Sequence, residues 1–240
     1  METTEEMQDF INQAFNESEH CDFGDYKLKN IRKLSAEDLV TVYEIYKSNI
    51  VADNVEYTQD VQRMIAFYFE YIKGAYQMAV TWFSKLADKG DAEAMYSLAC
   101  LYSDTYYGLK PDYPKALELL KQSADKGDID AMSYVAELYR GHFVERFGVE
   151  ENLPMAVEWY KRSFLQNGNR QAAVCLAHSY RDGCGIEKNL DKYNLLMKYA
   201  DRKEGVFDKD EARLIVADND EERVAYCKEN EIQPSAILAN

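Results

Sequence analysis

The stretch KALELLKQSADKG at residues 115–127, followed by AMSYVAELYRG at residues 131–141, decides the fold of this chain. The glycine-ended segment recurs at residues 78–90, 155–168 and 193–205, and the alanine-containing segment recurs at residues 94–102 and 172–180. The closing glycines, which are Gly90, Gly127, Gly168 and Gly205, are spaced by 37, 41 and 37 residues. The three alanine-containing segments are spaced by 37 and 41 residues. Two independent segments that share the same irregular spacing indicate an internal repeat.

Each repeated segment has the pattern of an amphipathic helix. Ala94, Leu98 and Leu101 recur at i, i+4 and i+7, which places them along one side of a helix. Pro114 and Pro154 stand where glycine-ended helices begin, a position that tolerates a missing N–H group. Small residues predict close helix approach at three equivalent positions: Ala99, Ala136 and Ala177. The sequence therefore predicts an all-α fold, an α/α superhelical solenoid of stacked antiparallel helix pairs.

The pattern divides the chain into four predicted parts. Residues 1–34 form an acidic, partly irregular segment, and residues 35–74 form N-terminal helices of a degenerate capping repeat, with Ser35 as an N-cap. Residues 75–205 form the regular repeats, and residues 206–240 form C-terminal capping helices and a tail. Atypical terminal repeats are expected because they cover the apolar ends of a stack.

The net charge of −15 is concentrated near the two ends of the chain. Residues 1–26 contain eight acidic side chains and no lysine or arginine, and residues 206–240 carry a net charge of −5. The body of the chain is therefore close to neutral and has no basic stripe. Because nucleic-acid binders present a basic face, we expect no nucleic-acid partner.

Three sequence features favour a protein of the cytoplasm, or of a host cytoplasm if the gene is viral or encodes an effector. The start, METTEEMQDF, is acidic where a secretory signal is basic and then apolar. The most apolar stretch, MIAFYFEYI at residues 64–72, is short and contains Glu70, so no membrane span is expected. Five cysteines without a CxxC pair indicate a reducing compartment.

No residue pattern predicts catalysis, a metal site or a cofactor. His178 follows Cys175 by three residues, but the surrounding sequence supplies no further ligands for a metal. Cys184 lies in a glycine loop without the base or cation that a reactive thiolate needs. The acidic run at 218–222 begins like a calcium loop, yet Arg223 stands where the turn glycine belongs. The sequence therefore predicts a protein that is not an enzyme.

The repeat pattern resembles the Sel-one-like repeat (SLR) family, a relative of the tetratricopeptide repeats. The best matches are AMSYVAELYRG with MAVEWYKRSF at 155–164, and AVCLAHSYRDGCGIEKNLDK at 173–192, which keeps the family's G-x-G loop. The resemblance to the family is good from about residue 75 to residue 205. The extended loop at 142–154 and Asn194 depart from the pattern. The resemblance implies a non-enzymatic adaptor or scaffold that binds a protein or peptide.

The same resemblance implies that the first helix of each repeat lines the concave side of the solenoid. The residues outside the apolar stripe are equivalent by repeat register, and they form the predicted partner-binding set: Tyr96, Cys100, Ser103, Ser133, Glu137, Arg140, Val174, His178 and Arg181. We expect Arg140 and Arg181 to be charged anchors and Tyr96 an aromatic anchor. The alternative is that these side chains form an ordinary solvated surface.

Two other functions stay open, although a monomeric adaptor is favoured. The first is a structural protein that forms homo-oligomers through an uncapped end of the stack. The second is weak penicillin-type hydrolysis, which is credited to a secreted, cysteine-rich branch of the family. The cysteines of that branch pair near the positions of Ala124 and Ala131, which cannot form the bridge.

Overall fold

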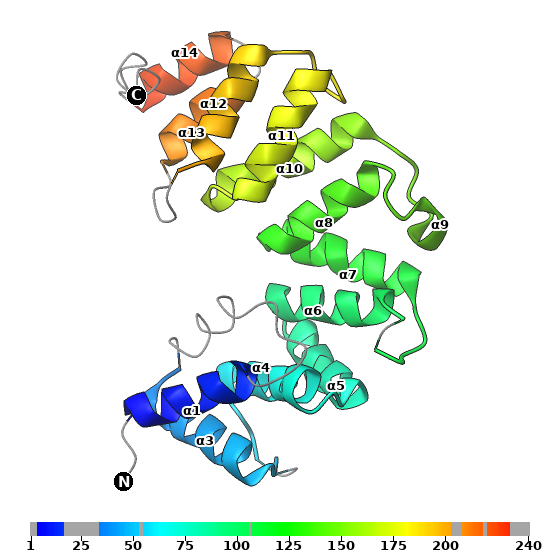
Figure 1. Ribbon diagram of the computed structural model, residues 1–240, viewed down its shortest axis with the longest axis vertical. Helices are drawn as coiled ribbons and strands as arrows, with labels where there is room; N and C mark the ends of the chain where they lie inside the picture. The colour runs from blue at the N-terminus through cyan, green and yellow to red at the C-terminus, as the bar shows by residue number, and fades with distance from the viewer. Residues whose placement is uncertain are drawn as a thin grey trace. The chain divides into compact units, whose positions relative to one another are not determined.

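The computed structural model describes residues 4–16, 34–52, 55–105, 107–202, 208–217 and 220–230, and all regular structure within these ranges is helical (Figure 1). This confirms the predicted all-α solenoid class, in which consecutive helices pack as antiparallel pairs. The chain divides into two compact units, Met1–Leu119 and Leu120–Asn240.

The N-terminal unit is a stack of helices around one apolar core. Its elements are α1 (Thr4–Asn16), α3 (Ala36–Ser48), α4 (Gln59–Phe67), the π-helical turn η1 (Tyr68–Ile72), α5 (Tyr76–Asp88), α6 (Ala92–Ser103) and the start of α7 (Tyr113–Asp125). The core is rich in aromatic rings. Phe67 and Phe83, whose centroids lie 5.5 Å apart in an edge-to-face arrangement, are both almost fully buried. Packing of this kind stabilises a helix pair beyond its apolar area alone.

The C-terminal unit contains two helix pairs, which are followed by two shorter helices. Its elements are α8 (Ile129–Tyr139), α9 (Val144–Phe147), α10 (Leu153–Asn167), α11 (Arg170–Asp182), α12 (Leu190–Ala200), α13 (Lys209–Val216) and α14 (Asp220–Glu229). Helix α8 pairs with α10, α11 pairs with α12, and α10 also packs against α11. The predicted small contact positions Ala136 and Ala177 are fully buried, which confirms the close approach of these helices.

The helix ends follow the predicted capping chemistry. The Ser35 hydroxyl accepts a hydrogen bond from the Asp38 amide at 3.1 Å, which confirms this residue as an N-cap. Gly168 closes α10 in the left-handed conformation, with a φ of 74°. The equivalent Gly205 lies outside the described residues.

One backbone hydrogen bond recurs between the two helices of each repeat. The last tyrosine of the first helix accepts it through its carbonyl, and the N-cap residue of the second helix donates it. The three bonds are Asp112 N–H to Tyr102 at 2.9 Å, Asn152 N–H to Tyr139 at 2.7 Å and Asn189 N–H to Tyr180 at 2.9 Å. The bond fixes both ends of each connection, whatever the length of chain between them.

The apolar stretch at residues 64–72 belongs to the globular core. It forms the end of α4 and the turn η1, where Glu70 is 3% exposed. Among the described ranges, no helix combines the length and the apolar character that a membrane crossing requires.

Candidate functional site

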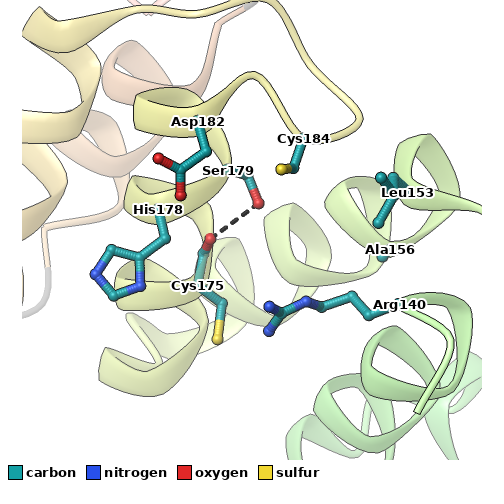
Figure 2. Close-up of a pocket in the computed structure, with 8 residues that line it drawn as sticks. All are labelled: Arg140, Leu153, Ala156, Cys175, His178, Ser179, Asp182 and Cys184. Carbon is teal, nitrogen blue, oxygen red and sulfur yellow. Dashed lines mark hydrogen bonds between the residues drawn. The ribbon is translucent and has the colours of Figure 1, made fainter.

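A small pocket in the C-terminal unit brings together Arg140, which directly follows α8, with residues of α10, α11 and the connection that follows α11 (Figure 2). Its volume is about 40 Å³, enough for a few atoms or ordered waters. The lining residues are Arg140, Leu153, Ala156, Cys175, His178, Ser179, Asp182 and Cys184. Two of them, Arg140 and His178, belong to the predicted partner-binding set. The other six were missed by the repeat-register argument.

Helix α11 supplies half of this lining from one face. Asn169 caps the helix by accepting a hydrogen bond from the Ala172 amide at 3.0 Å. Cys175, Ser179 and Asp182 then follow at i, i+4 and i+7, a spacing that places them on one side of the helix. This spacing is the sequence signal that could have found them. Figure 2 shows the Ser179 hydroxyl bonded to the Cys175 carbonyl, at 3.0 Å.

Gly185 closes the pocket's loop against the start of α10. A Cβ atom at this position would lie 2.3 Å from the carbonyl carbon and oxygen of Leu153, and φ is +74°. Only glycine combines this left-handed backbone with such a close approach. The finding agrees with the sequence-based interpretation that the glycines beside Cys184 serve the backbone.

Glu137 is the centre of a polar network beside the pocket. The buried Tyr160 hydroxyl donates a hydrogen bond to its Oε1, and His142 Nδ1 lies 2.6 Å from its Oε2. The Arg140 Nη1 and the Cys175 Sγ approach Oε1 at 3.4 and 3.9 Å. Burial, and then the bond to Glu137, raise the pKa of Tyr160, so its hydroxyl stays a donor. Glu137 therefore links α8, α10 and α11, in addition to any contact with a partner.

Burial also governs the thiol of Cys175. It raises the pKa of this thiol, which is 8% exposed, so the neutral S–H form dominates at physiological pH. A thiolate is the reactive form of cysteine, so Cys175 has the character of a packing residue. Within the described part of the chain, no group of three His, Cys, Asp or Glu side chains could hold a metal ion.

The two predicted arginine anchors differ in how far their charges are already compensated. Arg181 donates two hydrogen bonds of 2.8 Å to the Asp182 carboxylate, a bidentate pair that lowers the pKa of Asp182. The side chain of Arg140 is 41% exposed, and its contact with Glu137 is the long one of 3.4 Å. Figure 2 shows its guanidinium reaching toward Cys175. Arg140 is therefore the stronger candidate for binding an external group.

The remaining predicted residues occupy less accessible positions. Ser103 is 8% exposed and donates to the Cys100 carbonyl at 3.1 Å, so it does not lie on an accessible face. Ser133 donates to the Ile129 carbonyl at 2.9 Å and lies 3.2 Å from the Ser163 hydroxyl of α10. Helix register identifies the residues beside the apolar stripe, but the neighbouring helices determine which of them are covered. The half-buried members, Tyr96, Cys100 and Val174, stay a prediction as partner contacts.

Comparisons with known proteins agree with this arrangement. The family model described as Sel1 repeat matches residues 70–91, 92–128 and 129–167, the last of which contains the α8–α10 pair. The chain is similar to a Sel1 repeat protein from Oxalobacter formigenes, with a TM-score of 0.57 and 20% identity over 82% of this chain and 83% of that chain. It is also similar to a protective antigen of uropathogenic Escherichia coli with an SLR fold, with a TM-score of 0.53 and 17% identity over 97% of this chain and 58% of that chain. At these identities the structural likeness shows the fold alone. No curated protein matches the chain.

Proposed function

Because the chain is a Sel1-like repeat protein, we propose that it is a non-enzymatic adaptor that binds a protein or peptide partner. Repeat solenoids present extended surfaces, and their partners lie along the helices of the concave side. In the C-terminal unit the proposed surface consists of the first helices α8 and α11 together with the pocket beside Arg140. This proposal keeps the predicted residues that are accessible and leaves out Ser103.

The observation that carries the proposal is that the exposed positive charge of Arg140 is only partly compensated within the chain. Its side chain is 41% exposed at the edge of a small pocket, and its contact with the Glu137 carboxylate is 3.4 Å long. The neighbouring Tyr160 hydroxyl also favours its charged form. Glu137 in turn is shared with Tyr160 and His142, which bind it more closely. A partner carboxylate or carbonyl that reaches Arg140 would therefore compete with the long Glu137 contact and the Tyr160 hydroxyl, and not with a bidentate carboxylate pair like that of Arg181. Arginine in such a setting is a frequent source of binding energy in protein interfaces.

The experiment compares Arg140→Glu with Arg181→Glu as its matched control. The immobilised chain first captures a partner from the native cell, and the purified partner is then titrated calorimetrically against each variant. We expect Arg140→Glu to weaken binding by about tenfold or more, equal to about 1.4 kcal/mol. Arg181→Glu should weaken binding less, because the charge of Arg181 is already compensated by Asp182. Both variants should keep the wild-type helical circular-dichroism spectrum at the temperature of the titration, although Arg181→Glu, which loses its pair with Asp182, should melt slightly earlier. Unchanged affinity in Arg140→Glu would move the site away from this pocket.

The two alternative functions are tested separately. Light scattering at two protein concentrations distinguishes a monomeric adaptor from a structural homo-oligomer, whose mass would rise with concentration. An antibiotic-hydrolysis assay tests the enzymatic branch. The positions near the disulfide bridge of that branch hold Ala124 and Ala131, which are fully buried and have no thiol. The bridge cannot form here, so we expect no hydrolysis that depends on the bridge.

A further inference from the structure

The long connection between α8 and α10, residues 140–152, contains a backbone conformation that its sequence does not favour. Three residues around the short helix α9 have positive φ angles: Gly141 at 84°, Phe143 at 66° and Gly148 at 65°. Two of these positions hold glycine, which takes this conformation without cost, whereas the third holds phenylalanine. A bulky side chain in the left-handed region costs about 1–3 kcal/mol. In the described part of the chain, Asn49 is the other non-glycine residue with positive φ.

The backbone of this turn is held by main-chain hydrogen bonds that do not need the phenylalanine ring. The Phe143 carbonyl accepts from the amides of Arg146 at 2.9 Å and Phe147 at 3.0 Å, and the Gly148 amide donates to the Val144 carbonyl at 2.8 Å. Glycine at position 143 would form the same bonds without strain. The phenylalanine is therefore not explained by the local fold.

The ring of Phe143 instead contributes to a partly exposed apolar surface, which we call the aromatic patch and define as the exposed Phe143 and Val144 with the half-buried Tyr134 and Phe147. Phe143 is 47% exposed and Val144 is 40% exposed. The Phe143 and Tyr134 rings stack at 6.4 Å with an interplanar angle of 23°, and Phe147 meets Tyr134 edge-on at 6.1 Å. Figure 1 shows α9 standing off from the α8–α10 pair that it connects. A strained residue that exposes apolar surface indicates a binding role, because it lowers stability without filling the core.

The charges on the same connection indicate the kind of partner. The exposed carboxylates of the connection are Glu145, Glu150 and Glu151, which we call its acidic rim, and they outnumber its two exposed arginines, Arg140 and Arg146. The Arg146 guanidinium lies 5.7 Å from the Phe143 ring. An apolar surface with an acidic rim is complementary to a peptide that combines apolar and basic side chains. Anionic membrane surfaces would be repelled by the same rim.

We propose that the aromatic patch is a second docking surface, separate from the Arg140 pocket, and that it takes a basic amphipathic helix of a protein partner. The apolar side of that helix covers Phe143 and Val144, and its lysine or arginine side chains meet the carboxylates of the rim. This inference goes beyond the proposed function, since it does not depend on Arg140.

The test uses the full chain and a fluorescent amphipathic peptide of leucine and lysine, with the leucine–glutamate counterpart as a control peptide. Fluorescence anisotropy should show binding of the basic peptide and no binding of the acidic one. Phe143→Gly should weaken this binding by about tenfold or more, while its Tm equals or exceeds that of the wild type because the strain is relieved. Leu190→Ala is the matched control, an exposed apolar residue of the same unit, and should bind like the wild type.

Two further variants separate the possible reasons for a loss of binding. Glu145→Lys/Glu150→Lys changes only exposed side chains, and it should weaken the basic peptide and allow the acidic one to bind. Arg140→Glu adds negative charge to the same connection and should not weaken binding of the basic peptide, so a failure of the proposed function leaves this result intact. Full affinity in Phe143→Gly would overturn the proposal. So would binding of both peptides alike, preferential binding to phosphatidylserine vesicles, or a concentration-dependent dimer that Phe143→Gly dissociates.

Discussion

Two connections in the C-terminal unit are closed by the same backbone hydrogen bond but differ in how the residues between their ends are packed. Residues 140–152 join α8 to α10, and residues 183–189 join α11 to α12. In both, an asparagine amide donates to the carbonyl of the last tyrosine of the first helix, so the two ends are fixed alike. The shorter connection packs its Gly185 onto the Leu153 carbonyl, whereas the longer one exposes α9 and the Phe143 ring. The repeat therefore fixes where a connection starts and ends, and leaves its interior free to pack or to bind.

The largest effect on this comparison is expected from Gly185→Ala. The added methyl group would clash with the backbone of Leu153, which cannot rotate away as a side chain can. We expect a loss of about 3 kcal/mol or more in the free energy of unfolding, measured by urea denaturation followed by circular dichroism. Gly148→Ala in the longer connection is the matched control. Its φ is +65° and nothing lies within 4 Å, so only strain of about 1 kcal/mol is expected. Equal losses at the two glycines would remove the distinction between the connections.

A smaller effect is expected at the position three residues after each capping asparagine. Lys192 is 7% exposed, and its ammonium group donates to the Ala217 carbonyl and to the Tyr180 hydroxyl. Met155 holds the equivalent place after the longer connection and is 41% exposed. Lys192→Ala should lower the free energy of unfolding by about 2 kcal/mol, since it removes buried methylenes and these hydrogen bonds. Met155→Ala should cost less than about 1 kcal/mol. A larger loss at Met155 than at Lys192 would contradict the contrast between a packed shorter connection and an exposed longer one.

The smallest effect is a pH dependence at the exposed Arg181–Asp182 pair. The bond to Arg181 lowers the pKa of Asp182, so the pair stabilises the fold above the unfolded pKa of about 4. This contribution is lost as the pH falls through the lower folded pKa. The stability difference between wild type and Asp182→Asn should therefore be present at neutral pH and vanish in acid. Thermal melts across this range check it, and added salt should reduce the difference because the pair is solvent-exposed. A difference that is insensitive to both pH and salt would show that the ion pair is not its source.

The sequence was sufficient for those features that depend on local chemistry. The spacing of the glycine-ended segments predicts the helix pairs, and Ser35 and Gly168 are recognisable as helix ends. Capping depends on one side chain and the next few amides, and a glycine at a helix end depends on its own backbone. Neither requires knowledge of what packs nearby, so both are readable from one chain.

The candidate site was predictable only in part, because its features depend on neighbouring elements. Arg140 follows α8, Leu153 begins α10 and Cys184 follows α11. Repeat register alone does not predict that these three residues line one pocket. Ser103 is equivalent to Arg140 by register, yet it is covered by its surroundings. The left-handed Phe143 has no local signal at all, since phenylalanine ordinarily avoids this conformation.

The backbone hydrogen bond between Asn152 and Tyr139 closes the long connection, so residues can be inserted within this connection without separating the two helices. The N···O distance is 2.7 Å across this connection and 2.9 Å across each of the two equivalent ones, although the intervening chains differ in length. The entropy cost of lengthening such a closed loop rises only slowly, by about 0.6 kcal/mol for each doubling of its length. A foreign peptide inserted beside Gly148, where the backbone is open to solvent, would thus be displayed as a cassette on an intact repeat.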